Sequence, residues 1–390
     1  MDKRVIIFIL FCILVLLNIM QARSRRQNQW LAGMLFLTMF YFQVTAYRGD
    51  YLVYENIYTD LTDRFTTFGQ VLASGDEKFD IEILFLLFMF VFGRMHASFL
   101  VFYSAMTLLA YILLFFGVRK FTNKYGLLLA LYAISFWVWG SDLLRNFLAF
   151  SVIVFALHYI FKPGAKNKIK YLFFNALAAL FHITALFYLP FLFFSKRRPN
   201  LRIVAVIALT VSVLTVTANL LGLNVWGKLA ELLYFIYPND KILVYFDSAT
   251  GLGFVSPLVV VGSIYIANSY LSGRARNLRG DNSGNVENYF LLSNAMQNIA
   301  DYCCIILVLC AIQTVFLRII LNMVLLSFIY FAKHIGVARV YKNQLSLNTE
   351  EHCAGFSADY TVMIGFALII AIFTVIFYFG PGYYLQFFQF

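Results

Sequence analysis

The chain has 390 residues, of which 62% are hydrophobic, 19% are aromatic and only 13% are charged. A soluble globular protein carries roughly a quarter charged residues, so this composition excludes that class. Apolar runs long enough to cross a bilayer, about 17–25 residues each, recur from the beginning of the chain to its end. The composition therefore predicts a multi-pass membrane protein.

The formal net charge of +11 is distributed in a way that favours a membrane over nucleic acid. Basic residues come in short clusters between apolar runs, as the positive-inside rule gives for cytoplasmic loops. These clusters lie at Arg23–Arg26, Arg119–Lys124, Lys162–Lys170, Lys196–Arg202, Arg274–Arg279 and Lys333–Lys342. The charge thus indicates topology in a lipid bilayer and no nucleic-acid partner.

The apolar segments give the expected spans in chain order. No small-residue cleavage site follows the first long apolar run, which predicts a retained span. The spans are expected near 4–21, 29–46, 97–117, 125–140, 144–161, 203–221, 254–271, 290–312, 314–332 and 360–380, with a partial or tilted helix at 81–93. We predict an all-α, polytopic fold of about 10–12 transmembrane helices, including re-entrant or broken half-helices.

The polar stretches between the spans are too short for a separate soluble domain. We therefore expect a single membrane domain over 1–390. Its outer loops are expected at 47–80, which is rich in acidic residues, and at 222–253, and its cytoplasmic loops at 272–288 and 333–359. Two complete crossings between 81 and 117, instead of one, are an alternative.

Residues 171–194 have the length of one span, but basic clusters flank both ends. A single crossing would place the second cluster outside. A hairpin of two half-helices keeps both clusters inside and lifts His182 toward the outer face. Because irregular backbone at membrane depth is tolerated only where protein or a cavity surrounds it, the hairpin predicts that His182 faces the protein interior.

With this topology, five polar positions are expected at the outer face: Arg48, Asp50, Arg145, His182 and Arg318. Ionisable groups in or beside membrane segments are costly and are by default functional. An enzyme at the outer face of a bacterial-type membrane has no ATP, so it needs a pre-activated donor. A lipid-linked donor meets that need.

Arginines at membrane level suit a diphosphate, because guanidinium is always charged and forks onto phosphate oxygens. Arg145, with Asn146 beside it, is the first candidate, and Arg318 is the second. The simpler alternatives are a helix cap or an Asp142 ion pair for Arg145, and snorkelling to the interface for Arg318.

His182, with Thr184 nearby, is a candidate base for a sugar hydroxyl, because its pKa lies near neutrality. Asp50 is the competing base, and Tyr51 and Tyr54 offer stacking surfaces for sugar rings. The simpler alternatives are a satisfied core histidine and a solvated loop.

Several catalytic signatures are absent from the sequence. There is no P-loop, no HExxH, no GxSxG and no EF-hand loop. The five cysteines show no metal-ligand or disulfide spacing. No metal or other cofactor is expected.

The order of these residues resembles the EpsG-like family of exopolysaccharide biosynthesis proteins, which is related to the Wzy-type polymerases. The matching positions are Arg48-Gly49-Asp50-Tyr51 with Tyr54, a shortened form of the family's R-x-G-x-D-Y-x-x-Y, then Glu82, Arg145 with Ala149, Ala178 to Leu186 around His182, and the late Arg318. The resemblance implies an enzyme that joins oligosaccharide repeat units carried on undecaprenyl diphosphate, at the outer face of the cytoplasmic membrane.

In that implied reaction, a hydroxyl of one repeat unit attacks the anomeric carbon of another and the lipid diphosphate leaves. Arg145 and Arg318 would hold the diphosphate, and His182 or Asp50 would take the proton. Arg48, Tyr51, Tyr54 and Glu82 complete the expected substrate site. The implied products are exopolysaccharide, capsule or O-antigen, with a chain-length regulator and a flippase of the same pathway as candidate partners.

Three other functions stay open on the sequence. A glycosyltransferase that adds one residue from a lipid-linked sugar would use the same groups. A flippase for lipid-linked oligosaccharide would need charged residues through the whole bilayer, whereas here they gather at one side. A scaffold of the export machinery would tolerate loss of Arg145 and His182.

Overall fold

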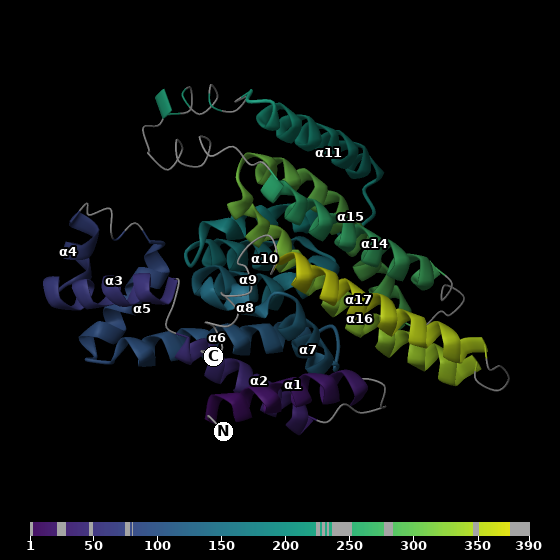
Figure 1. The fold of residues 1–390 in the computed structure, drawn as a ribbon, viewed down its shortest axis with the longest axis horizontal. Helices are drawn as coiled ribbons and strands as arrows, with labels where there is room; N and C mark the ends of the chain where they lie inside the picture. The colour runs from purple at the N-terminus through teal and green to yellow at the C-terminus, as the bar shows by residue number, and fades with distance from the viewer. Residues whose placement is uncertain are drawn as a thin grey trace. The chain divides into compact units, whose positions relative to one another are not determined.

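The structure is a computed structural model, and it describes residues 3–21, 29–46, 50–74, 79, 81–223, 227, 231, 234–235, 252–276, 284–345 and 351–374. All regular elements within these ranges are helices (Figure 1). Seven of them are long and apolar enough to cross a membrane, or eight if the bent pair Gln29–Thr45 and Asp50–Arg64 forms one span. Four shorter apolar helices accompany them. The predicted all-α, polytopic fold is confirmed.

The chain divides into two compact units, which the sequence did not indicate. Unit 1 comprises Met1–Phe193 together with Pro381–Phe390, and unit 2 comprises Phe194–Gly380. Residues 381–390 lie outside the described part of the chain. Each unit is described by itself below.

Unit 1 contains ten α-helices and two 3₁₀ helices in its described residues. They are α1 (Lys3–Gln21), α2 (Gln29–Thr45), α3 (Asp50–Arg64), α4 (Phe68–Ala73), α5 (Ile83–Arg94), α6 (Phe99–Arg119), α7 (Tyr125–Ser135), α8 (Trp137–Asp142), α9 (Leu144–Ala156), η2 (Leu157–Phe161), α10 (Ala165–Ala179) and η3 (Ile183–Phe193). The central element is α9, which is buried along nearly its whole length and packs against α6 and α10.

The close contact of α6 and α9 depends on a glycine. A Cβ atom built on Gly117 of α6 would lie 2.7 Å from the backbone nitrogen of Phe155, which is closer than non-bonded atoms approach. Only a residue without a side chain lets the two backbones meet at this distance.

The expected span at 125–140 is broken in the structure. α7 ends at Ser135, α8 covers the next turn, and α9 begins at Leu144. These breaks place Arg145 in the first turn of α9, as the sequence predicted for a residue that opens a helix.

The chain reverses direction at Leu180–His182, between α10 and η3. The Tyr171 hydroxyl donates to the carbonyl of Tyr188 at 2.7 Å, and the Asn175 amide donates to the carbonyl of Ala185 at 3.0 Å. These two pairs show that α10 and η3 run antiparallel. The antiparallel arrangement predicted for 171–194 is therefore present, with His182 at its tip, and its place in the membrane stays a prediction.

The stretch 47–80, expected as an outer loop, is largely helical in its described residues. α3 buries Tyr51, Tyr54, Ile57, Tyr58 and Leu61 against α5 and α6. These residues recur with the period of a helix, but the acidic side chains between them lower the mean hydropathy. The composition alone therefore predicted a loop where the structure has an amphipathic helix.

Unit 2 contains the long helices α11 (Pro199–Leu220), α14 (Val255–Arg276), α15 (Gly284–Ile312), α16 (Leu317–Leu345) and α17 (Glu351–Thr374). α15 packs against α11, α14 and α16, and α14 also packs against α17. The expected cytoplasmic loop at 333–359 is mostly helix, because α16 continues to Leu345 and α17 begins at Glu351. The prediction of a loop there was wrong, since helical hydrogen bonds continue beyond the apolar part of a span.

A buried polar network joins four helices of unit 2. The Asp359 side chain, 1% exposed, accepts a hydrogen bond from Tyr270 at 2.8 Å and lies 3.2 Å from His334 and 3.3 Å from Arg274. His334 in turn contacts the Tyr289 hydroxyl at 2.5 Å. These contacts satisfy a carboxylate that would otherwise be very costly to bury.

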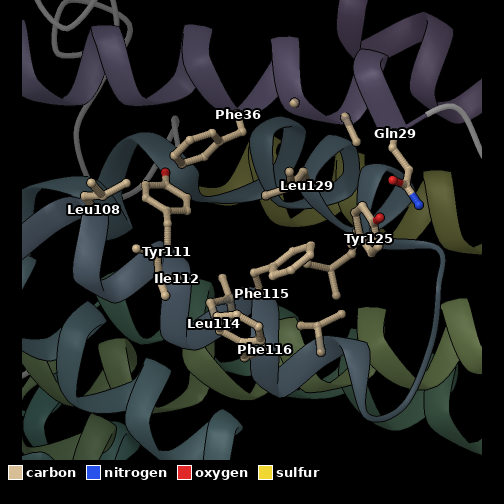
Figure 2. Close-up of a pocket in the computed structure, with 14 residues that line it drawn as sticks. Gln29, Phe36, Leu108, Tyr111, Ile112, Leu114, Phe115, Phe116, Tyr125 and Leu129 are labelled. Atoms are coloured by element: carbon tan, nitrogen blue, oxygen red, sulfur yellow. The ribbon is translucent and has the colours of Figure 1, made fainter.

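Unit 1 also contains an apolar pocket of about 470 Å³ between α2, α6 and α7. Figure 2 shows Phe36, Phe115 and Leu129 among its lining side chains. The hydroxyl of Tyr111, which also lines the pocket, donates to Gln43 and accepts from Trp137. No residue of the candidate site lines this pocket, and its apolar walls suit a hydrocarbon chain rather than phosphates.

Candidate functional site

Seven polar side chains of unit 1 form a connected group, which we call the polar cluster. They are Asp50 and Tyr54 of α3, Glu82 before α5, Arg145 and Asn146 of α9, and His182 and Thr184 at the tip of the hairpin. The side chains of Arg145, Glu82 and His182 are 20%, 18% and 9% exposed. The cluster is thus largely buried but open at one side.

Arg145 lies at the centre of the polar cluster. Its Nη1 pairs with the Glu82 carboxylate, and its Nε donates to the Tyr54 hydroxyl at 2.7 Å. The guanidinium carbon lies 5.2 Å from the centre of the Tyr54 ring. The second terminal nitrogen, Nη2, bonds to no described residue, so one edge of the guanidinium remains open for a ligand.

Tyr54 connects Arg145 to Asp50. Its hydroxyl accepts the Arg145 bond and donates to Asp50 Oδ2 at 3.0 Å. A charged donor on one side and a carboxylate acceptor on the other fix the direction of this hydroxyl. The position of Asp50 is therefore linked to that of Arg145, although 91 residues separate Tyr54 from Arg145.

The stacking role expected for Tyr51 and Tyr54 does not fit the structure. Tyr51 is 2% exposed and Tyr54 is 3% exposed. The Tyr51 ring packs edge-on against Phe99 and Tyr103, each at 4.9 Å, and the Tyr54 ring lies 5.4 Å from Phe85. Both rings belong to the core because α3 is amphipathic.

Glu82 holds the hairpin tip against Arg145. One carboxylate oxygen pairs with Arg145, and the other accepts the backbone N–H of Ile183 at 3.0 Å. The neighbouring N–H of Leu84 donates to the Leu180 carbonyl, also at 3.0 Å. Glu82 was expected to bind substrate, but these contacts make it the link between α9 and the hairpin.

His182 is oriented by Thr184 and Asn146. The backbone N–H of Thr184 donates to His182 Nδ1 at 3.2 Å, and the Thr184 hydroxyl donates to Asn146 Oδ1 at 3.0 Å. Because Nδ1 accepts a hydrogen bond, neutral His182 carries its proton on Nε2. The nearer oxygen of the Glu82 carboxylate lies 3.6 Å from Nδ1.

Two of the predicted site residues, Arg48 and Arg318, are not among the members of the polar cluster. Arg48 falls outside the described residues. Arg318 is the second residue of α16 in unit 2, and its Nε is buried without a hydrogen-bond partner among the described residues. The convergence of Arg318 with Arg145 stays a prediction.

The sequence named Asn146 and Thr184 only as neighbours of the candidates. Their hydrogen bond joins α9 to the hairpin tip over 38 residues of chain, and no local pattern signals such a pair. Among the described residues, no group of three or more His, Cys, Asp or Glu side chains is placed to hold a metal ion.

The sequence model of the EpsG family matches residues 29–349 of this chain. No curated protein and no solved structure matches it. The matched range includes every residue of the polar cluster and Arg318. This multi-pass, all-helical membrane protein belongs to the EpsG family, which associates it with exopolysaccharide biosynthesis.

Proposed function

We propose that this protein is a polysaccharide polymerase that joins oligosaccharide repeat units carried on undecaprenyl diphosphate. The observation that carries the proposal is Arg145, a half-buried guanidinium held by Glu82 and Tyr54 with one edge open. Such a group is preorganised to stabilise negative charge on a phosphate oxygen. The proposed location is the bacterial cytoplasmic membrane, with the polar cluster at its outer face.

In the proposed reaction, Arg145 binds the diphosphate of the donor through Nη2. The acceptor hydroxyl attacks the anomeric carbon of the donor, and the bond from that carbon to the diphosphate oxygen breaks. The diphosphate leaves with the electron pair of that bond, and Arg145 stabilises its charge. The hydroxyl proton passes to a base of the polar cluster.

Asp50 is the better candidate for this base. Its carboxylate is linked to Arg145 through the Tyr54 hydroxyl, which accepts from Arg145 Nε and donates to Asp50 Oδ2 at 3.0 Å. The Nδ1 atom of His182 already accepts the Thr184 N–H, so His182 would lose a hydrogen bond on taking a proton there. We assign His182 to positioning, through its Nε2–H, and Asp50 to proton transfer.

The test is the length of glycan on the lipid carrier in cells that lack the native gene. The cells express wild-type protein, Arg145→Ala or Asp50→Asn at matched membrane abundance. Arg94→Ala and Asp63→Asn are the controls, because both residues are exposed and lie on α5 and α3. We expect polymer from wild type and controls, and single repeat units from the two site variants.

Other outcomes assign other functions. Polymer from both site variants overturns the site assignment. Loss of a single sugar, with polymer length unchanged, indicates a transferase that adds one residue. Failure of the lipid-linked unit to reach the outer face without the protein indicates a flippase.

A further inference from the structure

Three lysines from two separate basic clusters surround one tyrosine ring in unit 1. The ammonium nitrogens of Lys120, Lys162 and Lys170 lie 5.7, 6.0 and 5.4 Å from the centre of the Tyr159 ring. Lys120 also lies 3.8 Å from the centre of the Phe155 ring. The sequence showed these lysines only as topology signals in two different loops.

Three helical segments, α6, η2 and α10, bring the lysines to the Tyr159 ring. Lys120 directly follows α6, and Lys162 directly follows η2. A turn at Gly164, with φ of 98°, then starts α10 and brings Lys170 back over Tyr159. The Tyr159 ring stacks on Phe174 of α10 at 6.1 Å, which fixes the ring that the lysines share.

The segments that carry the three lysines contain no acidic residue of their own. Between Glu82 and Glu231 the only acidic residue is Asp142, and no described carboxylate forms an ion pair with any of the three. Partial burial lowers the pKa of Lys120, and the charge of Lys162 lowers it further. The lysines therefore repel one another unless an anion binds.

The side chains also retain hydrogen-bond donors. Lys120 donates to the Phe155 carbonyl at 3.2 Å and contacts His158 Nδ1 at 3.2 Å, which leaves one of its three N–H groups. The Lys162 and Lys170 ammonium groups bond to no described residue. Several N–H donors without acceptors, next to one another, match the oxygens of a phosphate.

The position of the lysines relative to the spans indicates the level of the ligand. Lys120 follows the candidate span Phe99–Arg119, and Lys162 follows the candidate span Leu144–Phe161. If these helices cross the bilayer, their ends come at the level of the lipid phosphates, because the apolar part of a span matches the hydrocarbon core. Basic pockets at such a level bind anionic headgroups.

We propose that Lys120, Lys162 and Lys170, gathered around Tyr159, form a binding site for a phosphate group at the membrane surface. An anionic phospholipid supplies this group at the highest local concentration, and a soluble phosphate ester has the same chemistry. The proposal does not depend on the polymerase function, because none of these residues belongs to the polar cluster.

The test measures phospholipid binding to the purified full-length protein. Detergent-solubilised protein is titrated with phosphatidylglycerol or phosphatidylcholine, and bound lipid is counted by native mass spectrometry. The variant Lys120→Gln/Lys162→Gln/Lys170→Gln is compared with Arg119→Gln/Lys166→Gln/Lys168→Gln. The second variant removes the same charge from the same two segments, but no contact joins its residues to Tyr159.

We expect wild type and the control variant to bind phosphatidylglycerol in preference to phosphatidylcholine. The first variant should lose about fivefold in affinity per lysine, which is on the order of 100-fold for the three. A parallel titration with inorganic phosphate or glycerol 3-phosphate, in phosphatidylcholine alone, distinguishes the sources. Saturable binding there, lost in the first variant only, assigns the site to a soluble phosphate.

Two results overturn the proposal. Equal losses in both triple variants mean that only the overall charge of these segments attracts anions. Absence of preferential binding in wild type, for lipid and soluble phosphate alike, means that the lysines form no site. Thermal unfolding of each variant shows whether lost binding is caused by misfolding instead. A variant that has lost only the binding site keeps the ligand-free unfolding midpoint of wild type.

Discussion

Glu82 and Arg145 form an ion pair across 63 residues of chain, and the same glutamate accepts the backbone N–H of Ile183 at 3.0 Å. One carboxylate therefore fixes both the guanidinium and the tip of the hairpin that carries His182. Breaking a half-buried pair by removing one partner leaves the other charge unsatisfied. The proposed substrate site depends on this link.

Arg145→Lys tests whether the planar guanidinium matters beyond its charge. Lysine keeps the charge but cannot bond Glu82, Tyr54 and a phosphate together, because its donors lie on a single nitrogen. We expect less polymer than in wild type and more than in Arg145→Ala, for which the loss should reach about 10²–10³-fold. Polymerisation rates on a purified lipid-linked repeat unit measure both.

Wild-type activity in Arg145→Lys would mean that Arg145 acts as a point charge alone. The exposed Arg94→Lys is the matched control, and we expect it to be unchanged.

Glu82→Gln tests the link between α9 and the hairpin. Glutamine can still accept the Ile183 N–H, but it leaves Arg145 without a counter-charge. We expect this variant to fold and to lose activity, since Arg145 is no longer held in place. Glu82→Ala should also lower stability, by about 0.5–1.5 kcal/mol, because the exposed Ile183 N–H then loses its acceptor.

Thermal unfolding in detergent and polymerisation assays separate these two effects. If Glu82→Gln and Glu82→Ala unfold at the same temperature, the backbone contact contributes nothing to stability. Glu55→Gln, at a partly exposed position of α3, is the control.

Thr184→Val tests the orientation of His182. The substitution keeps the side-chain shape but removes the hydroxyl that bonds Asn146 and contacts His182. Loss of this buried hydrogen bond to Asn146 Oδ1 should cost about 0.5–1.5 kcal/mol. We also expect a lower polymerisation rate at unchanged substrate affinity, since His182 positions reacting groups.

Thr59→Val, at an exposed position of α3, is the control for this change. A lower affinity with an unchanged rate would instead assign Thr184 to substrate binding.

Gly117→Ala tests the close contact of α6 and α9. Alanine usually stabilises a helix relative to glycine by roughly 0.5–1 kcal/mol, but here its Cβ would meet backbone atoms of Phe155 at 2.7 Å. Overpacking of this kind costs about 1–3 kcal/mol, so the net effect should be destabilising. Thermal unfolding measures it.

Gly33→Ala is the matched control, because a Cβ there meets no atom within 4 Å. We expect its unfolding temperature to be unchanged or higher. An equal change in the unfolding temperature of both variants would show that helix propensity alone determines the effect of the substitution.

Asp359→Asn tests the buried network of unit 2. Asparagine cannot accept charge-assisted bonds from Arg274 and His334, and it adds donors that have no acceptor there. Breaking a buried ion pair typically costs about 3–5 kcal/mol. We expect a lower thermal unfolding midpoint, whereas Asp63→Asn, at an exposed position of α3 that is not part of this network, should leave it unchanged.

The sequence determined the class of fold, and it singled out several residues that the structure brings together in the polar cluster. Long apolar runs can only be helices in a bilayer, because each backbone group must be satisfied within its own segment. The costly ionisable groups Arg145 and His182 were visible for the same reason, and the flanking basic clusters predicted the hairpin. The sequence predicted loops at 47–80 and 333–359, where the structure has helices, because amphipathic or polar residues continue the helices there.

Only the tertiary structure decided what the site residues contact. Tyr54 and Glu82 were expected to meet the substrate, yet they meet Arg145, and the bond of Thr184 to Asn146 joins segments 38 residues apart. Lys120 and Lys170 likewise share a tyrosine ring although they come from different loops. Hydropathy and local spacing fix where a helix forms, but contacts between distant side chains depend on how the helices pack, which no local pattern records.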